Sequence, residues 1–182
     1  MWAVRSVKSE LEIERIRKAC DINIRAFEKA FTSVQENMTE LELFRYIACE
    51  MFRLGADDVF PLGIRAGADR YGHANCPPGD RPIGRQEIIL IDGGPGYRGY
   101  FSDIIRLACI GPPSSRQTDL MNVAIEACVT GVEAVKPGVT PAQICETVDQ
   151  FSLRSHFAGQ YVSRGMAGHA LGLDIQDRKS VV

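Results

Sequence analysis

The spacing of apolar residues predicts two helices in the first third of the chain. Across residues 9–31 an apolar side chain recurs at every third or fourth position, which forms one apolar stripe along a helix. A second helix is expected to begin after Thr39, because Glu42 stands three residues later and completes a capping box. Gly55 is expected to end this helix, since glycine is favoured just beyond a helix C-terminus.

The same signals predict two more helices further along. One covers residues 115–135. The other begins after Thr140, with Pro141 at the favoured first position and Gln143 completing a capping box, and it ends near Phe157. Each long helix is followed by a short link, a Thr-capped helix and then glycine-containing, strand-like sequence. This order favours an α+β fold of two pseudo-twofold halves, each a helix pair with a sheet, and a site between the halves.

Two apolar runs between the helix pairs predict a β-hairpin. The run EIILID ends at Asp92 and the run SDIIRLACI carries Asp103, with the turn-forming GGPGYRG between them. If the chain turns about Tyr97 and Arg98, the two aspartates face each other with β-carbons about 4.5–5.5 Å apart. Carboxylates this close repel each other unless a proton or a cation lies between them, and a cation is the expected occupant.

His169 is the third candidate metal ligand. It follows Gly168 and precedes apolar residues in GHALGL, which would bring its imidazole close against a site. Taken singly, Asp92 could cap a turn, Asp103 could pair with Arg106, and His169 could be structural. Two carboxylates and an imidazole together are ligands typical of a divalent-metal site.

Composition excludes several function classes. Of the 182 residues 45% are hydrophobic, and a net charge of −2 with a pI near 5.9 gives no attraction to nucleic acid or to a membrane surface. No apolar stretch reaches the roughly 18 residues of a membrane span, and the first residues lack the apolar core of a secretory signal. Six cysteines without a CxxC pair are expected to be reduced core residues of a cytoplasmic protein.

The run from Arg5 to Gln176 resembles the metallopeptidases of the pita-bread fold: methionine aminopeptidase, aminopeptidase P, prolidase and the metal-free relative creatinase. RSVKSELEIERIRKACDI resembles the first helix of their catalytic domain. IDGGPGYRGYFSDIIRLACIG resembles the stretch with their first two metal-binding aspartates, and GMAGHALGLDI the stretch with their metal-binding histidine. The Xaa-Pro peptidase-like members are the most similar.

The resemblance implies two divalent metal ions (Mn, Co, Fe or Zn) held by five side chains. Asp92 would bind one ion, Asp103 would bridge both, and His169 would bind the other. The remaining two ligands of the family, both glutamates, lie beyond the point where this chain stops. The implied reaction is hydrolysis of an N-terminal amide bond of a small peptide by a metal-bridged hydroxide, often with proline after the scissile bond.

Several histidines that assist proton transfer in the family are replaced here. Asn75 stands where relatives carry a histidine and is a candidate for substrate binding, while His73, two residues earlier, is the candidate proton donor. Gly165 and Gln176 replace two further histidines, and His156 is expected to be structural or on the surface. Loss of an acid–base group typically lowers a rate by about 10²–10⁴-fold. The alternatives are therefore a creatinase-like hydrolase of small amides or amidines, and a non-catalytic binding module.

Both ends of the chain depart from the family pattern. Residues 1–176 are expected to be a partial catalytic domain without the N-terminal domain that helps relatives form homodimers. Residues 177–182, DRKSVV, coincide with the translation of a sequencing-adapter read-through and are expected to be a non-native tail; the alternative is a natural short C-terminus. The full-length protein is expected to be a homodimeric enzyme, and the 182-residue chain, which lacks two ligands, is expected to be inactive.

Overall fold

The structure is a computed structural model that describes residues 5–60, 62–70, 77–161 and 168–179. The chain divides into two compact units. The first comprises Met1–Pro113 and Leu171–Asp177, and the second comprises Ser114–Ala170 and Arg178–Val182. Each unit contains one pair of long helices.

Two capped helices form one layer of the first unit. They are α2 (Glu10–Ser33) and α3 (Glu40–Arg53), and both begin with a capping box. In α3 the box joins Thr39 and Glu42, which confirms the predicted start. Gly55 follows the helix with φ +103°, a left-handed conformation that glycine adopts readily, so the predicted stop is confirmed as well.

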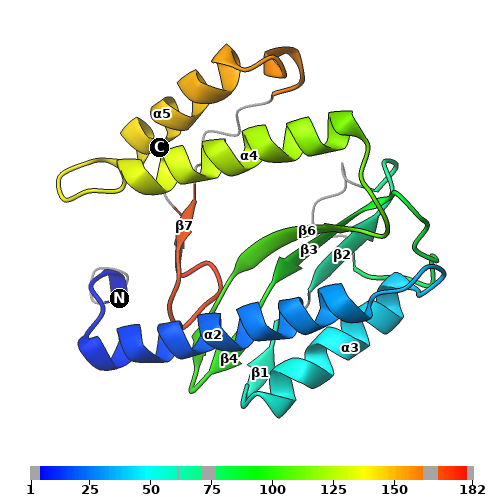
Figure 1. Cartoon of the computed structure of the whole chain (residues 1–182). Coiled ribbons are helices and arrows are strands. Elements are labelled where there is room, and N and C mark those ends of the chain that lie inside the picture. The colour runs from blue at the N-terminus through cyan, green and yellow to red at the C-terminus, as the bar shows by residue number, and fades with distance from the viewer. Residues whose placement is uncertain (1–4, 61, 71–76, 162–167, 180–182) are drawn as a thin grey trace. The chain divides into compact units, whose positions relative to one another are not determined.

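An antiparallel sheet forms the other layer of this unit. Its strands β2 (Gly63–Ala66), β3 (Ile88–Gly93) and β6 (Ile104–Cys109) lie in the order β2-β3-β6, so β3 is central. Helices α2 and α3 lie along one face of this sheet (Figure 1). Alternate strand residues enter the core between the two layers, which includes Ile64, Ala66, Ile89, Ile91, Phe27, Leu43 and Ile47.

A second, smaller sheet extends the hairpin beyond β3 and β6. Its strands are β1 (Asp58–Val59), β4 (Pro95–Tyr97) and β5 (Tyr100–Phe101), in the order β1-β4-β5. Arg98 and Gly99 join β4 to β5, with φ values of +49° and +79°. Positive φ at both central residues is what a two-residue type I′ hairpin turn requires.

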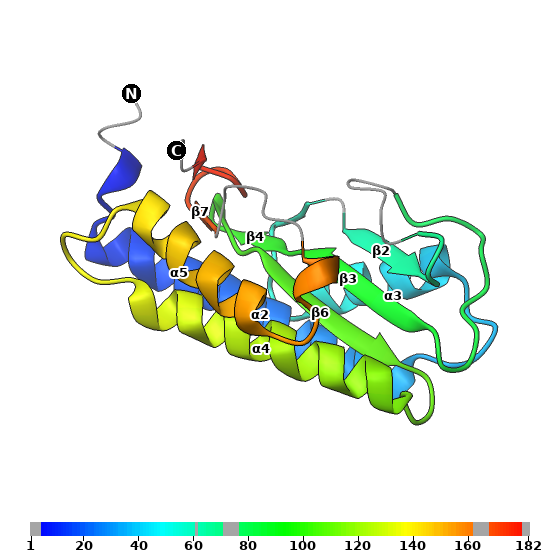
Figure 2. The ribbon, with the colours of Figure 1, turned by 90° about the horizontal axis from the view of Figure 1, so that it is seen from above.

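The second unit is built around another helix pair. Helices α4 (Ser115–Ala134) and α5 (Pro141–Arg154) run side by side in both ribbon views (Figures 1 and 2). A short 3₁₀ helix, η1 (Ala158–Gln160), follows, and the two-residue strands β7 (His169–Ala170) and β8 (Arg178–Lys179) pair with each other. The strand-like GHALGLDI thus contributes only two residues to a strand, and β8 falls in the segment predicted to be a tail.

Helix α5 ends earlier than the sequence analysis predicted. Its last residue is Arg154, whereas the sequence favoured an end near Phe157. Ser155 is extended, its hydroxyl donates to the carbonyl of Ser152 at 2.8 Å, and it accepts from the amide of Phe157 at 3.2 Å. These local side-chain bonds replace the helical ones, as serine often does at helix ends.

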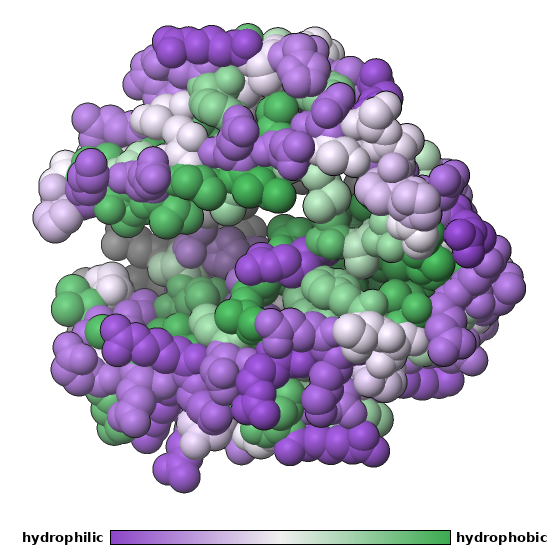
Figure 3. All heavy atoms as spheres, in the orientation of Figure 1, coloured by the Kyte–Doolittle hydropathy of each residue, from purple (hydrophilic) through white to green (hydrophobic). Residues whose placement is uncertain are grey.

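Burial differs sharply between α2 and α4, the first helices of the two pairs. Six residues of α2 are buried, but within α4, all of which is described, none is. Ile125, Val129 and Val132 of α4 are 54%, 49% and 67% exposed. Figure 3 shows hydrophobic side chains in a row along this helix. An apolar face of α4 is therefore left uncovered by the described residues of its own unit.

The cysteines do not all lie where their apolar surroundings predicted. The five described cysteines are free. Cys145 is buried, but Cys49 and Cys128 are exposed, so the expectation of core positions is wrong for these two. Across the described residues, no helix combines the length and the apolar character that crossing a bilayer requires.

Candidate functional site

Asp92 lies near the end of the central strand, on the face of the sheet that points away from the helices. Its neighbours Ile89 and Ile91 alternate with it and are buried in the core on the opposite face. The Asp92 side chain is 36% exposed, and its Oδ2 lies 3.6 Å from Nη2 of Arg65 on β2. The carboxylate is thus accessible from one side and paired with a guanidinium on another.

Asp103 is not the cross-strand partner of Asp92. The ladder pairs Asp92 with Ile105 and ends at the pair Gly93–Ile104, a register two residues away from the predicted one. The reason is the turn: the chain reverses at Arg98 and Gly99 rather than at Tyr97 and Arg98. Asp103 immediately precedes Ile104, so the two aspartates flank the last pair of the ladder diagonally.

One buried side chain ties together the residues next to both aspartates. Asn23 of α2 is fully buried, and its Nδ2 donates to the carbonyl of Gly93 and to Oγ of Ser102, each at 2.9 Å. Gly93 follows Asp92, and Ser102 precedes Asp103. The backbone approaches so closely here that a Cβ on Gly94 would lie 2.4 Å from Nδ2 of Asn23. Asn23 therefore fixes the junction from which both carboxylates project.

The surroundings of the aspartates fit a bound cation. The Oδ1 atom of Asp103 is inaccessible to solvent, whereas the side chain of Asp92 is 36% exposed. The Cys20 thiol hydrogen-bonds Ser102, and burial raises its pKa, so it is neutral at pH 7. Hard carboxylate oxygens with one imidazole suit Mn, Fe, Co or Zn ions.

His169 lies in strand β7 of the second unit, and its imidazole is partly buried. Its Nδ1 lies 3.3 Å from the carbonyl oxygen of Ala170. Asp92 and Asp103 belong to the first unit, so neither unit by itself contains all three predicted ligands. The segment after His169 does return to the first unit, where the amide of Phe101 donates to the carbonyl of Gly172 at 2.9 Å.

The predicted proton donor and substrate contact, His73 and Asn75, lie outside the described residues. The chain on both sides of them is anchored by Glu40 at the start of α3. This fully buried carboxylate accepts from the amide of Ala66 at 2.9 Å, from the amide of Gly79 at 3.2 Å and from Arg70 at 2.9 Å. This role is hard to predict from sequence, because a Glu after a Thr cap is common on exposed first turns.

Two residues near the chain end have defined surroundings. Gln176, predicted to replace a family histidine, is exposed. Asp177 is buried and forms ion pairs with Arg5 and Lys8, the latter at 3.4 Å. The first residue of the predicted tail therefore contributes to the first unit.

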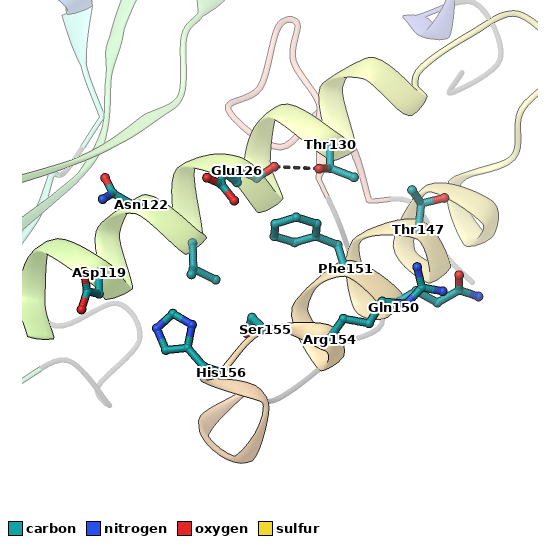
Figure 4. A pocket seen from close by; sticks show the side chains of 11 residues that line it. Asp119, Asn122, Glu126, Thr130, Thr147, Gln150, Phe151, Arg154, Ser155 and His156 are labelled. Atoms are coloured by element: carbon teal, nitrogen blue, oxygen red, sulfur yellow. Dashed lines mark hydrogen bonds between the residues drawn. The ribbon is translucent and has the colours of Figure 1, made fainter.

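A groove of about 660 Å³ lies between α4 and α5 (Figure 4). Asp119 and Glu126 line it from α4, Arg154 from α5, and His156 from just beyond α5. The ring of His156 packs on that of Phe157, with centroids 4.3 Å apart. Among the residues that the structure describes, no group of three or more His, Cys, Asp or Glu side chains is placed to hold a metal ion. The acidic residues and the histidine of this groove therefore do not form such a group.

Comparisons with known proteins agree on one family. The sequence profile described as "Metallopeptidase family M24" matches residues 14–182. A Xaa-Pro dipeptidase of Pyrococcus horikoshii is 29% identical over 96% of this chain and 49% of its own length. An uncharacterized peptidase of Staphylococcus saprophyticus is 28% identical over 98% of this chain and 50% of its own length.

Solved structures give the same result for the fold. Prolidase from Pyrococcus furiosus superimposes with a TM-score of 0.87 at 29% identity, covering 96% of this chain and 51% of that one. An X-Pro aminopeptidase from Thermotoga maritima gives 0.86 at 27% identity, covering 99% and 52%. The chain spans about half the length of the relatives that it matches.

Proposed function

This chain belongs to metallopeptidase family M24 and has the α+β pita-bread fold, and we propose that it carries metal-binding residues of a hydrolase with two divalent ions. Asp92 would hold one ion, Asp103 would bridge both, and His169 would hold the other. Residues 1–176 would be part of the catalytic domain.

The arrangement of the two aspartates is the observation that carries this proposal. They flank the last pair of the β3–β6 ladder, and the buried Asn23 holds the residue next to each of them. A strand end fixed in this way presents carboxylates with little freedom, which is what tight metal binding requires.

The proposed reaction is hydrolysis of an amide bond near a free amino terminus. When bound, two divalent ions lower the pKa of a water nucleophile and stabilise negative charge on the scissile carbonyl. The residues of this chain would position that chemistry: Asp92, Asp103 and His169 would hold the ions, and His73 would donate a proton to the departing amine. Asn75 would contact the substrate.

The names of the relatives support small Xaa-Pro peptides as substrates. The whole protein would be a cytoplasmic homodimer. Creatinase-like hydrolysis of a small amide or amidine would use the same fold, and a panel of Xaa-Pro dipeptides tested beside small cyclic amides separates the two chemistries.

Metal binding tests the proposal without relying on turnover. Calorimetric titration of the 182-residue chain with Mn²⁺ is expected to show saturable binding, and Asp92→Asn, Asp103→Asn and His169→Gln are each expected to weaken it at least tenfold. Asp119→Asn, in the groove of the second unit, is the matched control and should change nothing. Equal affinity in all four variants would overturn the assignment of the ligands.

A further inference from the structure

A buried arginine stands beside the proposed metal ligand Asp92. Arg65 is on β2, next to the central strand, and its side chain is 7% exposed. Strand pairing places Gly63 directly opposite Asp92, and Arg65 follows two residues later, on the same face of the sheet. Its Nη2 lies 3.6 Å from Oδ2 of Asp92.

The surroundings of Gly63 locate the guanidinium of Arg65. A Cβ built on Gly63 would lie 3.5 Å from Nη2 of Arg65 and 3.7 Å from Cβ of Asp92. The guanidinium therefore lies over Gly63 and against the carboxylate. Because an arginine keeps its charge at all ordinary pH values, Arg65 places a permanent positive charge beside Asp92. This charge is largely inaccessible to water.

A fixed cation at this point changes what the carboxylate can bind. A positive charge within about 4–6 Å lowers the affinity of a carboxylate for a proton by roughly 10- to 1000-fold. A divalent ion on the same carboxylate experiences repulsion of the same kind, and burial reduces the screening by water. At the same time the guanidinium holds Asp92 in one orientation.

We propose that Arg65 is a positioning residue that shares Asp92 with the metal ion and keeps metal binding weak and exchangeable. The relevant ligand is a divalent cation in the proposed site, so this inference rests on the proposed function. Its consequence is unusual for a buried charged residue: removing Arg65 should tighten metal binding, whereas simple damage to the fold would weaken it.

The test compares Mn²⁺ affinity among variants of the 182-residue chain by calorimetry or by the electron paramagnetic resonance of free Mn²⁺. Arg65→Gln is expected to lower the Kd at least about tenfold, and Arg65→Lys, which keeps the charge, to stay within about threefold of the wild type. Asp92→Asn combined with Arg65→Gln should abolish the gain. Unchanged or weaker binding by Arg65→Gln would overturn the inference.

A measurement on the unaltered chain covers the case in which Arg65→Gln does not fold. In the ¹⁵N-labelled wild type, titration with diamagnetic Zn²⁺ should shift the Nε–Hε signal of Arg65, identified by its loss in Arg65→Lys, in step with metal saturation. A signal that stays fixed while Zn²⁺ binds would contradict the proposal that Arg65 shares Asp92 with the metal ion. It would leave the proposed metal site itself intact. If neither the wild type nor Arg65→Gln binds any divalent ion, the proposed metal site fails, and this inference fails with it.

Discussion

The two helix pairs share their local signals but differ in what they bury. All four helices begin with a capping box, and α3 and α5 are both 14 residues long after a Thr cap. Yet α2 and α3 enclose a core against a three-stranded sheet, whereas α4 leaves its apolar face uncovered by the described residues of its unit. The capping residues thus determine where a helix begins. Whether its apolar face is buried depends on a second layer of structure, which the sequence of the helix does not specify.

Breaking the anchor at the start of α3 should have the largest effect. Glu40→Ala leaves the guanidinium of Arg70 and two backbone amides without their buried acceptor, and loss of one partner of a buried pair costs about 3–5 kcal/mol. Urea unfolding measures the change. Glu146→Ala, which alters an exposed carboxylate of α5, is the control and should stay within about 0.5 kcal/mol. Equal losses would mean that Glu40 is not a structural anchor.

A matched pair of isoleucines tests the difference in burial directly. Ile22 of α2 is fully buried and Ile125 of α4 is 54% exposed. Ile22→Ala is expected to lower the free energy of unfolding by about 2–5 kcal/mol, because a cavity remains in the core. Ile125→Ala should cost less than about 1 kcal/mol in the isolated chain. A large cost at Ile125 would show that the apolar face of α4 is covered in solution.

The helix starts could be predicted because their capping signals are local, but the buried face of α2 could be predicted only in part. The large apolar residues suggested a stripe that includes Ile24, which is 44% exposed. The buried residues of α2 include Phe27 of that stripe, but three of the six are alanines, Ala19, Ala26 and Ala30, all fully buried. Small side chains let the helix approach the strands closely, and a pattern of large residues does not reveal that.

In the candidate site, too, features with a local sequence signal could be predicted, and features that depend on contacts between distant residues could not. Asp92 and Asp103 could be identified as candidates from a local motif, although their predicted register was wrong because the turn lies at Arg98 and Gly99 and not at Tyr97 and Arg98. A shift of two residues kept them near the same strand end. Asn23 and Arg65 could not be found, since each acts through a contact with residues distant in sequence. A polar residue inside an apolar helix pattern, such as Asn23, is the one signal that was available.

The link from helix to site is the next feature to test. Asn23→Ala removes two buried hydrogen bonds and is expected to cost about 1–3 kcal/mol, because the carbonyl of Gly93 and Oγ of Ser102 lose their donor. It should also weaken Mn²⁺ binding, since the strand end that bears Asp92 is released. Asn122→Ala, which alters an exposed side chain of α4, is the matched control and should alter neither quantity. If Asn23→Ala binds Mn²⁺ as tightly as the wild type, Asn23 stabilises the fold but does not position the metal ligands.

The capping boxes offer the smallest and most selective comparison, because those of the first unit contain glutamate and those of the second contain glutamine. Hydrogen bonds from Ser9 and Thr39 lower the pKa values of Glu12 and Glu42. A carboxyl group whose pKa is lower in the folded state stabilises the fold above its unfolded pKa, which is about 4.3, and loses this contribution as the pH falls through the folded value. Gln117 and Gln143 carry no such charge.

Acidification from pH 7 to about pH 3.5 should therefore weaken the caps of α2 and α3 and spare those of α4 and α5. The double variant Glu12→Gln, Glu42→Gln should lose less stability on acidification than the wild type, as measured by urea unfolding at both pH values. The reciprocal variant Gln117→Glu, Gln143→Glu should lose more. If both variants respond to acid as the wild type does, the caps are not the source of the difference, and other carboxylates of the first unit, such as Glu50 beside Lys29, must carry it.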